Sequence, residues 1–283
     1  MRTQRTVHNQ REFDQAVADR VGLITVDDDP KNPNEWVDID DSCPWESVVE
    51  VRGRGGVRLW GNVRIAAHDR SEVHAHGSSR VAAYDGSSVQ AYDSSAVIAN
   101  DRSFTYATGN VNVACYDESR VHTEGDCDVR AFGSSRVFAI GGGTVSTHES
   151  ASASVFGTTS ADAHDASTVF TDESATVTAF DDSHVDTGGS SQAELFGNST
   201  ADVRDSSTVV VHGNAQAAVH SSTASTVAVA GGSVVPDYDT DDLPDIDPVP
   251  PSGDVFVPAG TTTTKDGRTV PREAYVRRQR QKG

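Results

Sequence analysis

The sequence has few of the residues that build a thick core or a membrane anchor. Aromatic residues make up 6% and apolar residues 36% of its 283 positions, and both fractions are low for a domain with one large core. No stretch approaches the roughly 18 consecutive apolar residues of a transmembrane helix. The first residues lack the apolar segment of a secretory signal. We therefore expect no membrane association and a cytoplasmic location.

Cysteine and positive charge are also scarce. Three cysteines are too few for a disulfide scaffold and fit a reducing compartment. The 23 Lys and Arg residues face 42 Asp and Glu residues, which gives a net charge of -19. This charge argues against direct binding to a nucleic-acid backbone or to an anionic membrane.

An eight-residue repeat occupies most of the chain. From Val49 to Ala217 a residue that is usually Val recurs every eight positions without an insertion. A small apolar residue or Thr follows two positions later, Gly or an acidic residue four later, and Ser or another small residue six later. The consensus is Ser-x-Val-x-Ala-x-(Asp/Gly)-x. A repeat this regular indicates a stacked architecture.

Each octad predicts one short strand and one tight corner. The alternation of small apolar and polar residues is typical of a strand with one buried face. Gly, Asp and Ser supply turn chemistry at the corner. A helix is excluded because eight residues make about 2.2 helical turns, so the Val positions would spiral around the cylinder. Stacked octads bury a narrow, continuous core, which predicts an all-β fold, a parallel β-solenoid.

The number of octads per coil is predicted from the position three residues after each Val. Sorting this position by every third octad gathers aromatic residues on one track, which favours a coil of three octads, about 24 residues. A coil of two octads, about 16 residues, is the alternative. If exposed, the track is a candidate surface for sugar rings or a protein partner; if turned into the corner, it stiffens the coil. Its residues are Trp60, Tyr84, Phe132, Phe156 and Phe180.

Four segments are predicted from these patterns. The N-terminal segment has helical spacing around Phe13 and Ala16 and a strand at Gly22–Val26, which suggests a small α/β cap over the open end of the solenoid. Near Val227 the repeat register slips by two, and Pro236 then ends strand pairing. The segments are 1–46 (cap), 47–235 (solenoid), 236–260 (acidic Pro-rich linker) and 261–283 (basic, irregular tail).

The basic tail is a candidate docking peptide for an acidic partner, for the solenoid's own surface or for another copy. The alternative is an unstructured tail without a partner. The residues that would dock are Arg272, Arg277, Arg278 and Arg280.

Catalysis is not predicted, and neither is a metal or a cofactor. Enzymatic β-helices build grooves from long insertions at their corners, whereas these octads have none, and turn chemistry explains most of the Asp residues. His74 and His76 would project from one strand near His68, but a zinc site needs further ligands close by. We interpret these histidines as surface residues.

An ice-binding function is not predicted either. Ice-binding solenoids need rows of outward Thr on one flat face, whereas the outward position after Val holds Gln90, Ile98, Tyr106, Ala114, His122, Arg130 and Phe138.

Octads such as Ser87-Ser88-Val89-Gln90-Ala91-Tyr92-Asp93 and Ser95-Ala96-Val97-Ile98-Ala99-Asn100-Asp101 resemble the short-repeat β-solenoid proteins of bacteriophages and actinobacteria. The resemblance covers residues 49–231. It implies the solenoid architecture and a phage or prophage origin, with a place in the virion as the alternative to the cytoplasm. It carries over no catalytic residue.

Three functions follow as hypotheses. The first is a non-catalytic structural or binding solenoid, phage-encoded and associated with the virion or its assembly, whose partner is a protein, further copies of the chain or a carbohydrate. The second is an acidic DNA mimic that occupies a nucleic-acid-binding protein. The third is a polymer-forming scaffold similar to the bactofilins. The expected helix at residues 10–21 and the Pro-rich stop both argue against end-to-end stacking.

Overall fold

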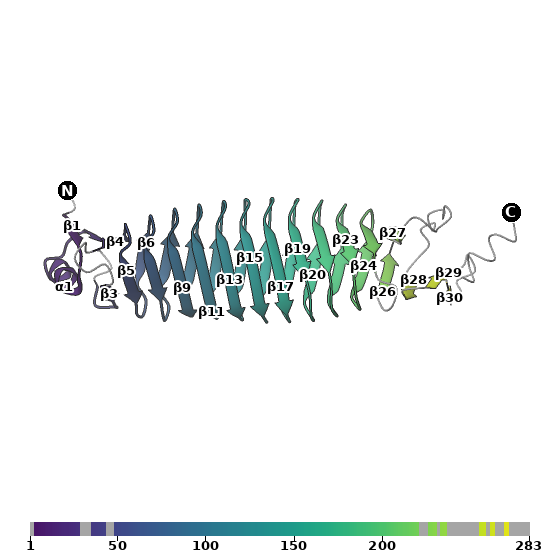
Figure 1. The fold of residues 1–283 in the computed structure, drawn as a ribbon, viewed down its shortest axis with the longest axis horizontal. Helices are drawn as coiled ribbons and strands as arrows, with labels where there is room; N and C mark the ends of the chain where they lie inside the picture. The colour runs from purple at the N-terminus through teal and green to yellow at the C-terminus, as the bar shows by residue number, and fades with distance from the viewer. Residues whose placement is uncertain are drawn as a thin grey trace. The chain divides into compact units, whose positions relative to one another are not determined.

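The computed structural model describes residues 3–28, 35–43, 48–220, 226–230, 233–236, 255–258, 261–263 and 269–271. The chain forms two compact units, residues 1–145 (unit 1) and residues 146–283 (unit 2). It is a parallel β-solenoid of about 13 turns, with roughly 16 residues per turn (Figure 1). The predicted solenoid is confirmed. No helix among the described residues is long and apolar enough to cross a membrane.

Each turn contains two octads, and each octad gives one strand to one of two sheets. In unit 1 the even-numbered strands form the even sheet, which also contains β1, and the other odd-numbered strands form the odd sheet. Val97 pairs with Val81 on one side and with Val113 on the other, two octads away in both directions. The predicted coil of three octads is therefore wrong, and the alternative of two octads is confirmed.

The strands of unit 1 are short and parallel. Its even sheet consists of β1 (Gln4–Val7), β2 (Leu23–Val26), β4 (Val48–Val51), β6 (Arg64–Ala67), β8 (Arg80–Ala83), β10 (Ala96–Ala99), β12 (Asn112–Cys115), β14 (Asp128–Ala131) and β16 (Thr144–Thr147), which contains the end of the unit. Its odd sheet consists of β3 (Trp36–Ile39), β5 (Gly56–Leu59), β7 (Glu72–Ala75), β9 (Ser88–Asp93), β11 (Phe104–Gly109), β13 (Arg120–Gly125) and β15 (Arg136–Gly141).

Unit 2 repeats this plan. Its odd strands are β17 (Ser152–Gly157), β19 (Thr168–Thr171), β21 (His184–Thr187), β23 (Thr200–Val203), β25 (Gln216–Val219) and β27 (Ser233–Pro236). Its even strands are β18 (Ser160–Ala163), β20 (Thr176–Ala179), β22 (Gln192–Leu195), β24 (Thr208–His212), β26 (Thr226–Ala230) and β28 (Val255–Pro258). A separate two-stranded sheet joins β29 (Thr261–Thr263) and β30 (Thr269–Pro271).

The core is one thin layer of small side chains between the two sheets. The Val position and the small position two residues later point inward, and Val57, Ala83 and Val89 are buried. The Ser position lies inside the corner, where the hydroxyl of Ser191 donates to the carbonyl of Gly188 at 2.6 Å. A hydrogen bond of this kind contributes about 1 kcal/mol. Small residues at every inward position let the two sheets approach closely, which makes a two-sided coil favourable.

A short helix covers the beginning of unit 1, as predicted. Helix α1 (Gln10–Ala18) starts at Asn9, whose side chain accepts the backbone N–H of Glu12 at 3.0 Å. It buries Phe13 and Ala16 and packs on β1, β2 and β3. The Gln10 amide accepts the N–H of Asp38 at 2.6 Å and donates to its carbonyl at 3.0 Å. Helix α1 thus occupies backbone groups of β3 that would otherwise be open to another strand.

In the C-terminal part of the repeat the predicted register slip is confirmed, but the prediction that strand pairing ends at Pro236 is wrong. Val209 of β24 pairs with Val227 of β26, so the register has slipped by two residues. Strand β28 then pairs antiparallel with β26. Most of the predicted linker 236–260, much of the tail 261–283 and all four tail arginines lie outside the described residues, so these segment predictions stay predictions.

Candidate protein-binding face

The predicted aromatic track is not one surface. With two octads per turn, Tyr84, Phe132 and Phe180 follow even strands, whereas Trp60 follows the odd strand β5 and Phe156 belongs to the odd strand β17. Four of these rings stack on a ring one turn away, namely Trp60, Tyr84, Phe132 and Phe180. The stacked pairs in unit 1 are His68 on Tyr84, Tyr116 on Phe132, and His76 on both Trp60 and Tyr92, with centroids 4.4–5.1 Å apart.

Unit 2 carries a column of five such rings. His148, His164, Phe180, Phe196 and His212 stack in order, with neighbouring centroids 4.4–5.5 Å apart and planes within 12°. Phe156 instead meets Phe170 at 5.8 Å with a tilt of 53°. Because the flat faces in the columns cover one another, a sugar ring has no open face to stack on along the column. The columns therefore support the corner-stiffening interpretation of the aromatic residues.

The three histidines considered for a metal site lie in different surroundings. His76 is stacked between Trp60 and Tyr92, while His74 lies 4.5 Å from the Trp36 ring. His68 stacks on Tyr84 after an even strand. Within the ranges that the structure describes, no group of three or more His, Cys, Asp or Glu residues could hold a metal ion.

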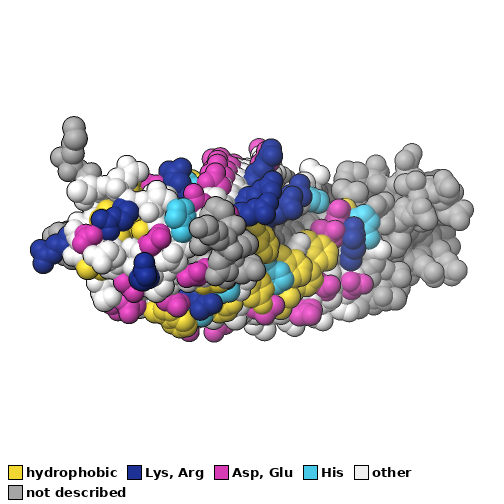
Figure 2. All heavy atoms as spheres, turned by 60° about the vertical axis from the view of Figure 1, so that its left-hand side comes forward, with side chains coloured by type: hydrophobic (Ala, Val, Ile, Leu, Met, Phe, Trp, Pro, Cys, Tyr) yellow, Lys and Arg dark blue, Asp and Glu magenta, His cyan; other side chains and the backbone are white. Residues whose placement is uncertain are grey.

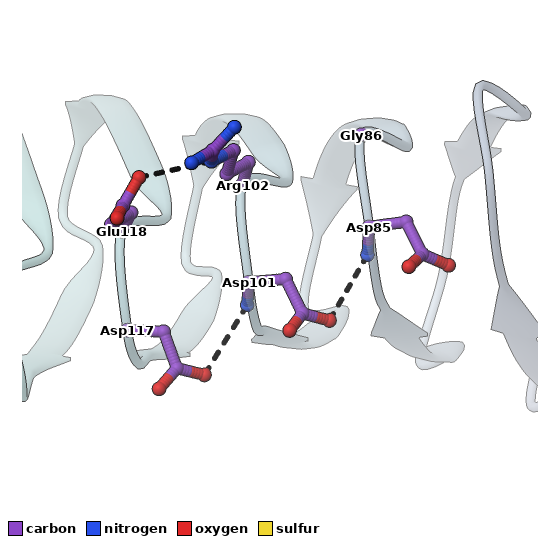
Figure 3. Close-up of a pocket in the computed structure, with 6 residues that line it drawn as sticks. All are labelled: Asp85, Gly86, Asp101, Arg102, Asp117 and Glu118. Carbon is purple, nitrogen blue, oxygen red and sulfur yellow. Dashed lines mark hydrogen bonds and ion pairs between the residues drawn. The ribbon is translucent and has the colours of Figure 1, made fainter.

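Acidic corner residues form a ladder along one edge of unit 1. Asp69, Asp85, Asp101 and Asp117, here called the Asp ladder, have φ between 55° and 60°, a conformation that Asp adopts more readily than most residues. Each carboxylate accepts the backbone N–H of the corner residue one turn earlier, at 3.1–3.3 Å. Figure 3 shows two of these bonds in a shallow hollow that Gly86, Arg102 and Glu118 also line. Arg102 pairs there with Glu118 at 2.9 Å. The carboxylates therefore hold successive corners together.

This role predicts different outcomes for two substitutions at Asp101. Asp101→Asn keeps an oxygen for the Asp85 N–H and removes one of several like charges about 4.8 Å apart, so stability in low salt should stay equal or rise. Asp101→Ala loses the bond and puts alanine, which adopts positive φ less readily than Asp, at this corner, which should cost about 2 kcal/mol. Urea denaturation of both variants measures the difference. Equal destabilisation by Asn and Ala would contradict the hydrogen-bonding role.

The outer side of the odd sheet in unit 1 carries exposed aromatic and aliphatic side chains on three adjacent strands. In-register pairing of β11, β13 and β15 aligns Tyr106 with His122, and His122 with Phe138. Their rings lie 5.1 and 4.9 Å apart and are tilted by 42° and 46°. Phe104 is 44% exposed and Ile140 39%. We call these five residues the aromatic face.

Charged side chains border the aromatic face. Arg120 and Arg136 occupy neighbouring positions at the start of β13 and β15 and are exposed. Glu124 lies at the far end of β13, with one oxygen 3.5 Å from Nε2 of His122. Figure 2 shows one side of the molecule, on which hydrophobic side chains gather with Arg and acidic side chains beside them. An apolar patch with a charged rim, as Arg120, Arg136 and Glu124 give the aromatic face, is typical of a protein-interaction surface.

The sequence analysis does not predict the aromatic face. Tyr106, His122 and Phe138 belong to the outward series, but the intervening Ala114 and Arg130 make that series mixed in character. Those two residues lie on β12 and β14 of the even sheet. Taking alternate octads separates the two sheets and leaves a run of rings.

Membership of a known family is not shown for this chain. Comparison with protein-family models, with curated proteins and with solved structures finds no match. The similarity to phage and actinobacterial solenoids therefore stays a prediction, and the fold rests on the structure described above.

Proposed function

We propose that this chain is a non-catalytic binding scaffold whose aromatic face, on the odd sheet of unit 1, takes a protein partner. The observation that carries the proposal is the row of rings Tyr106, His122 and Phe138 on three adjacent strands of a regular sheet, with exposed Phe104 and Ile140 on its outer strands. Burying these side chains against a partner would gain about 25 cal/mol per Å² of apolar surface. The core of the solenoid does not need them, since its own layer is complete without them.

The composition of the face favours a protein over a carbohydrate. Aromatic residues and Arg are enriched in protein interfaces and dominate their binding energy. The tilt between Tyr106, His122 and Phe138 gives a rough surface of ring edges, which suits interdigitating side chains. A flat open ring platform, which a sugar would need, is not what these residues form.

The continuous repeat supports a role without catalysis. The strands from β4 to β15 follow one another with only short corners, so no long loop builds a wall or groove over either sheet in this part of unit 1. Binding sites on such solenoids lie on their regular faces. The predicted phage origin and virion association fit a rigid scaffold, and we retain them as part of the proposal.

The alternative functions have less support. The Asp ladder repeats at about 4.8 Å, whereas phosphates along one DNA strand advance about 3.4 Å per residue, so the ladder is a poor copy of DNA. One oxygen of each ladder carboxylate already accepts a backbone N–H. A bactofilin-like polymer would need open ends, and helix α1 covers strand β3 at the start of unit 1.

Site-specific photo-cross-linking tests the proposal. Benzoylphenylalanine would replace Tyr106 on the aromatic face and, as a matched control, Thr178 on the outer side of β20 in unit 2. In the cells that make the protein we expect discrete protein adducts from position 106 and none from position 178. No adduct from position 106, or the same diffuse adducts from both positions, would contradict a protein-binding role for this face.

A further inference from the structure

We infer that the partner on the aromatic face is a second copy of this chain, held by a two-fold axis that runs parallel to the stacking direction of the turns. The inference rests on the proposed function, because it names the partner of the same face. It follows from how charges are distributed across the rows of the odd sheet in unit 1. Each row has three outward positions, which in β13 are Arg120, His122 and Glu124.

The outward charges in the row of β13 are complementary to those of a second copy across this axis. A two-fold axis along the stack places each strand against the same strand of the second copy, running in the opposite direction. The first outward position then faces the third. In β13, Arg120 meets Glu124 of the second copy, twice in the dimer. In the row of β7, Glu72 meets His76 of the second copy.

The remaining rows carry few charges. In the row of β15, Arg136 faces Ile140 of the second copy and lies one row away from its Glu124. The central position of each row faces its own copy, so Tyr106 meets Tyr106 and Phe138 meets Phe138 near the axis. The row of β9, with Ser88, Gln90 and Tyr92, carries no charge. The row of β5 brings Arg58 near its copy, but this guanidinium already pairs with Asp38 at 3.6 Å.

The other face-to-face two-fold axis is disfavoured by the same charges. An axis parallel to the strands that passes over β13, the middle strand of the aromatic face, would place Arg120 against Arg120 and Glu124 against Glu124. Like charges directly opposite each other are destabilising. This axis would also bring the Asp ladder of one copy beside the Asp ladder of the other. The axis along the stack instead brings the ladder beside the opposite corner, which holds Gly61, Gly77, Gly109, Gly125 and Gly141, with Asp93 as its one acid among the described positive-φ corners.

The size of the face sets the expected strength of the dimer. A turn adds about 4.8 Å along the stack and four strand residues span about 13 Å, so six rows from β5 to β15 cover on the order of 400 Å² per copy. Twice this projected area is below the roughly 1,200 Å² of stable interfaces. We therefore expect a reversible dimer that dissociates on dilution, with a dissociation constant of roughly micromolar order.

Charge-swap variants of the full chain test the arrangement. Sedimentation velocity from about 1 to about 200 µM should show the wild type passing from one copy, 29.9 kDa, to two. Arg120→Glu puts the introduced glutamate against the native Glu124, and Glu124→Arg puts the introduced arginine against the native Arg120. Each single change should weaken the dimer about tenfold or more. The double variant R120E/E124R restores both opposite-charge pairs and should dimerise as the wild type does.

Mixing the two single variants gives a sharper test. In a mixed dimer, the introduced glutamate of one copy meets the introduced arginine of the other, and the native Glu124 meets the native Arg120. The mixture should therefore dimerise at concentrations well below those that either variant needs alone. Circular dichroism should show that all variants are folded, since both positions are exposed.

Two results would overturn the inference: a wild type that stays monomeric, or a folded double variant without rescue. Adducts of position 106 with a different protein would then still support the proposed function. The absence of any adduct from position 106 would remove both proposals.

Discussion

Gly143→Ala is expected to cost about 3 kcal/mol, the upper part of the usual range for overpacking. A β-carbon at residue 143 would lie 2.0 Å from the backbone carbonyl oxygen of Cys127 and 2.7 Å from its nitrogen. Both neighbours are main-chain atoms of the previous turn, so no side-chain rotation can relieve the contact. The neighbouring turns would have to separate. The matched control is Gly86→Ala, at an exposed corner where the nearest atom is 3.2 Å away, the oxygen of Asp69.

The thiol of Cys115 provides a local measurement of this effect. Burial raises its pKa to about 11, so the native thiol is protonated near neutral pH and should react slowly with a maleimide. A loss of about 3 kcal/mol should speed Cys115 labelling about a hundredfold if labelling requires opening of these turns. A local readout is preferable because long repeat arrays depart from two-state unfolding. Labelling of Gly143→Ala at the wild-type rate would show that the turns accommodate the methyl group.

Phe13→Ala should release the helix that covers the beginning of unit 1 and produce self-association. Phe13 is 3% exposed, and truncating a buried Phe costs about 3–5 kcal/mol. Once α1 loosens, Gln10 can no longer occupy the N–H and carbonyl of Asp38, and the edge of β3 becomes open to strands from other molecules. Light scattering should detect species larger than those of the wild type, growing with time and concentration.

Two further variants separate the packing of α1 from its hydrogen bonds. Arg11→Ala changes an exposed residue on the same helix and should behave as the wild type does. Gln10→Ala leaves Phe13 in place but removes both bonds to Asp38, and an intermediate degree of association is expected. If Phe13→Ala stays as soluble and as monodisperse as Arg11→Ala, the helix does not protect the edge of β3.

The fold could be predicted from the sequence because every octad repeats the same pattern of inward apolar residues and turn residues. Val49 to Ala217 keep one register, and alternation plus turn residues define a strand and a corner without any long-range information. The number of octads per turn could not be settled as easily, since it depends on contacts between turns. The aromatic track of the sequence analysis leaves out the histidines, and without them the spacing of two octads is not visible. Counted as flat rings, His148, His164 and His212 complete a column that advances by two octads from each ring to the next.

Prediction of the aromatic face depends on the same quantity, the number of octads per turn. Tyr106, His122 and Phe138 become neighbours only when alternate octads share a sheet, so a coil of three octads separates them.

The first turn of the solenoid could not be predicted from the sequence, for a different reason. Strands β2 and β3 add a turn before the first octad, but the segments that connect them differ in length from the octad corners. Their sequences therefore show no repeat.

A disulfide placed on the aromatic face tests the central claim, that residues two octads apart lie side by side there. In a Cys43→Ser background, Tyr106→Cys/His122→Cys puts two thiols on adjacent in-register strands, where Cα atoms about 4.8 Å apart are within the range of a disulfide. Tyr106→Cys/Arg130→Cys places them three octads apart, on opposite sheets. Oxidation at high dilution, followed by non-reducing peptide mapping, should show an intramolecular 106–122 bridge and no 106–130 bridge. A 106–130 bridge without a 106–122 bridge would contradict the turn of two octads, and with it the aromatic face and its proposed partner.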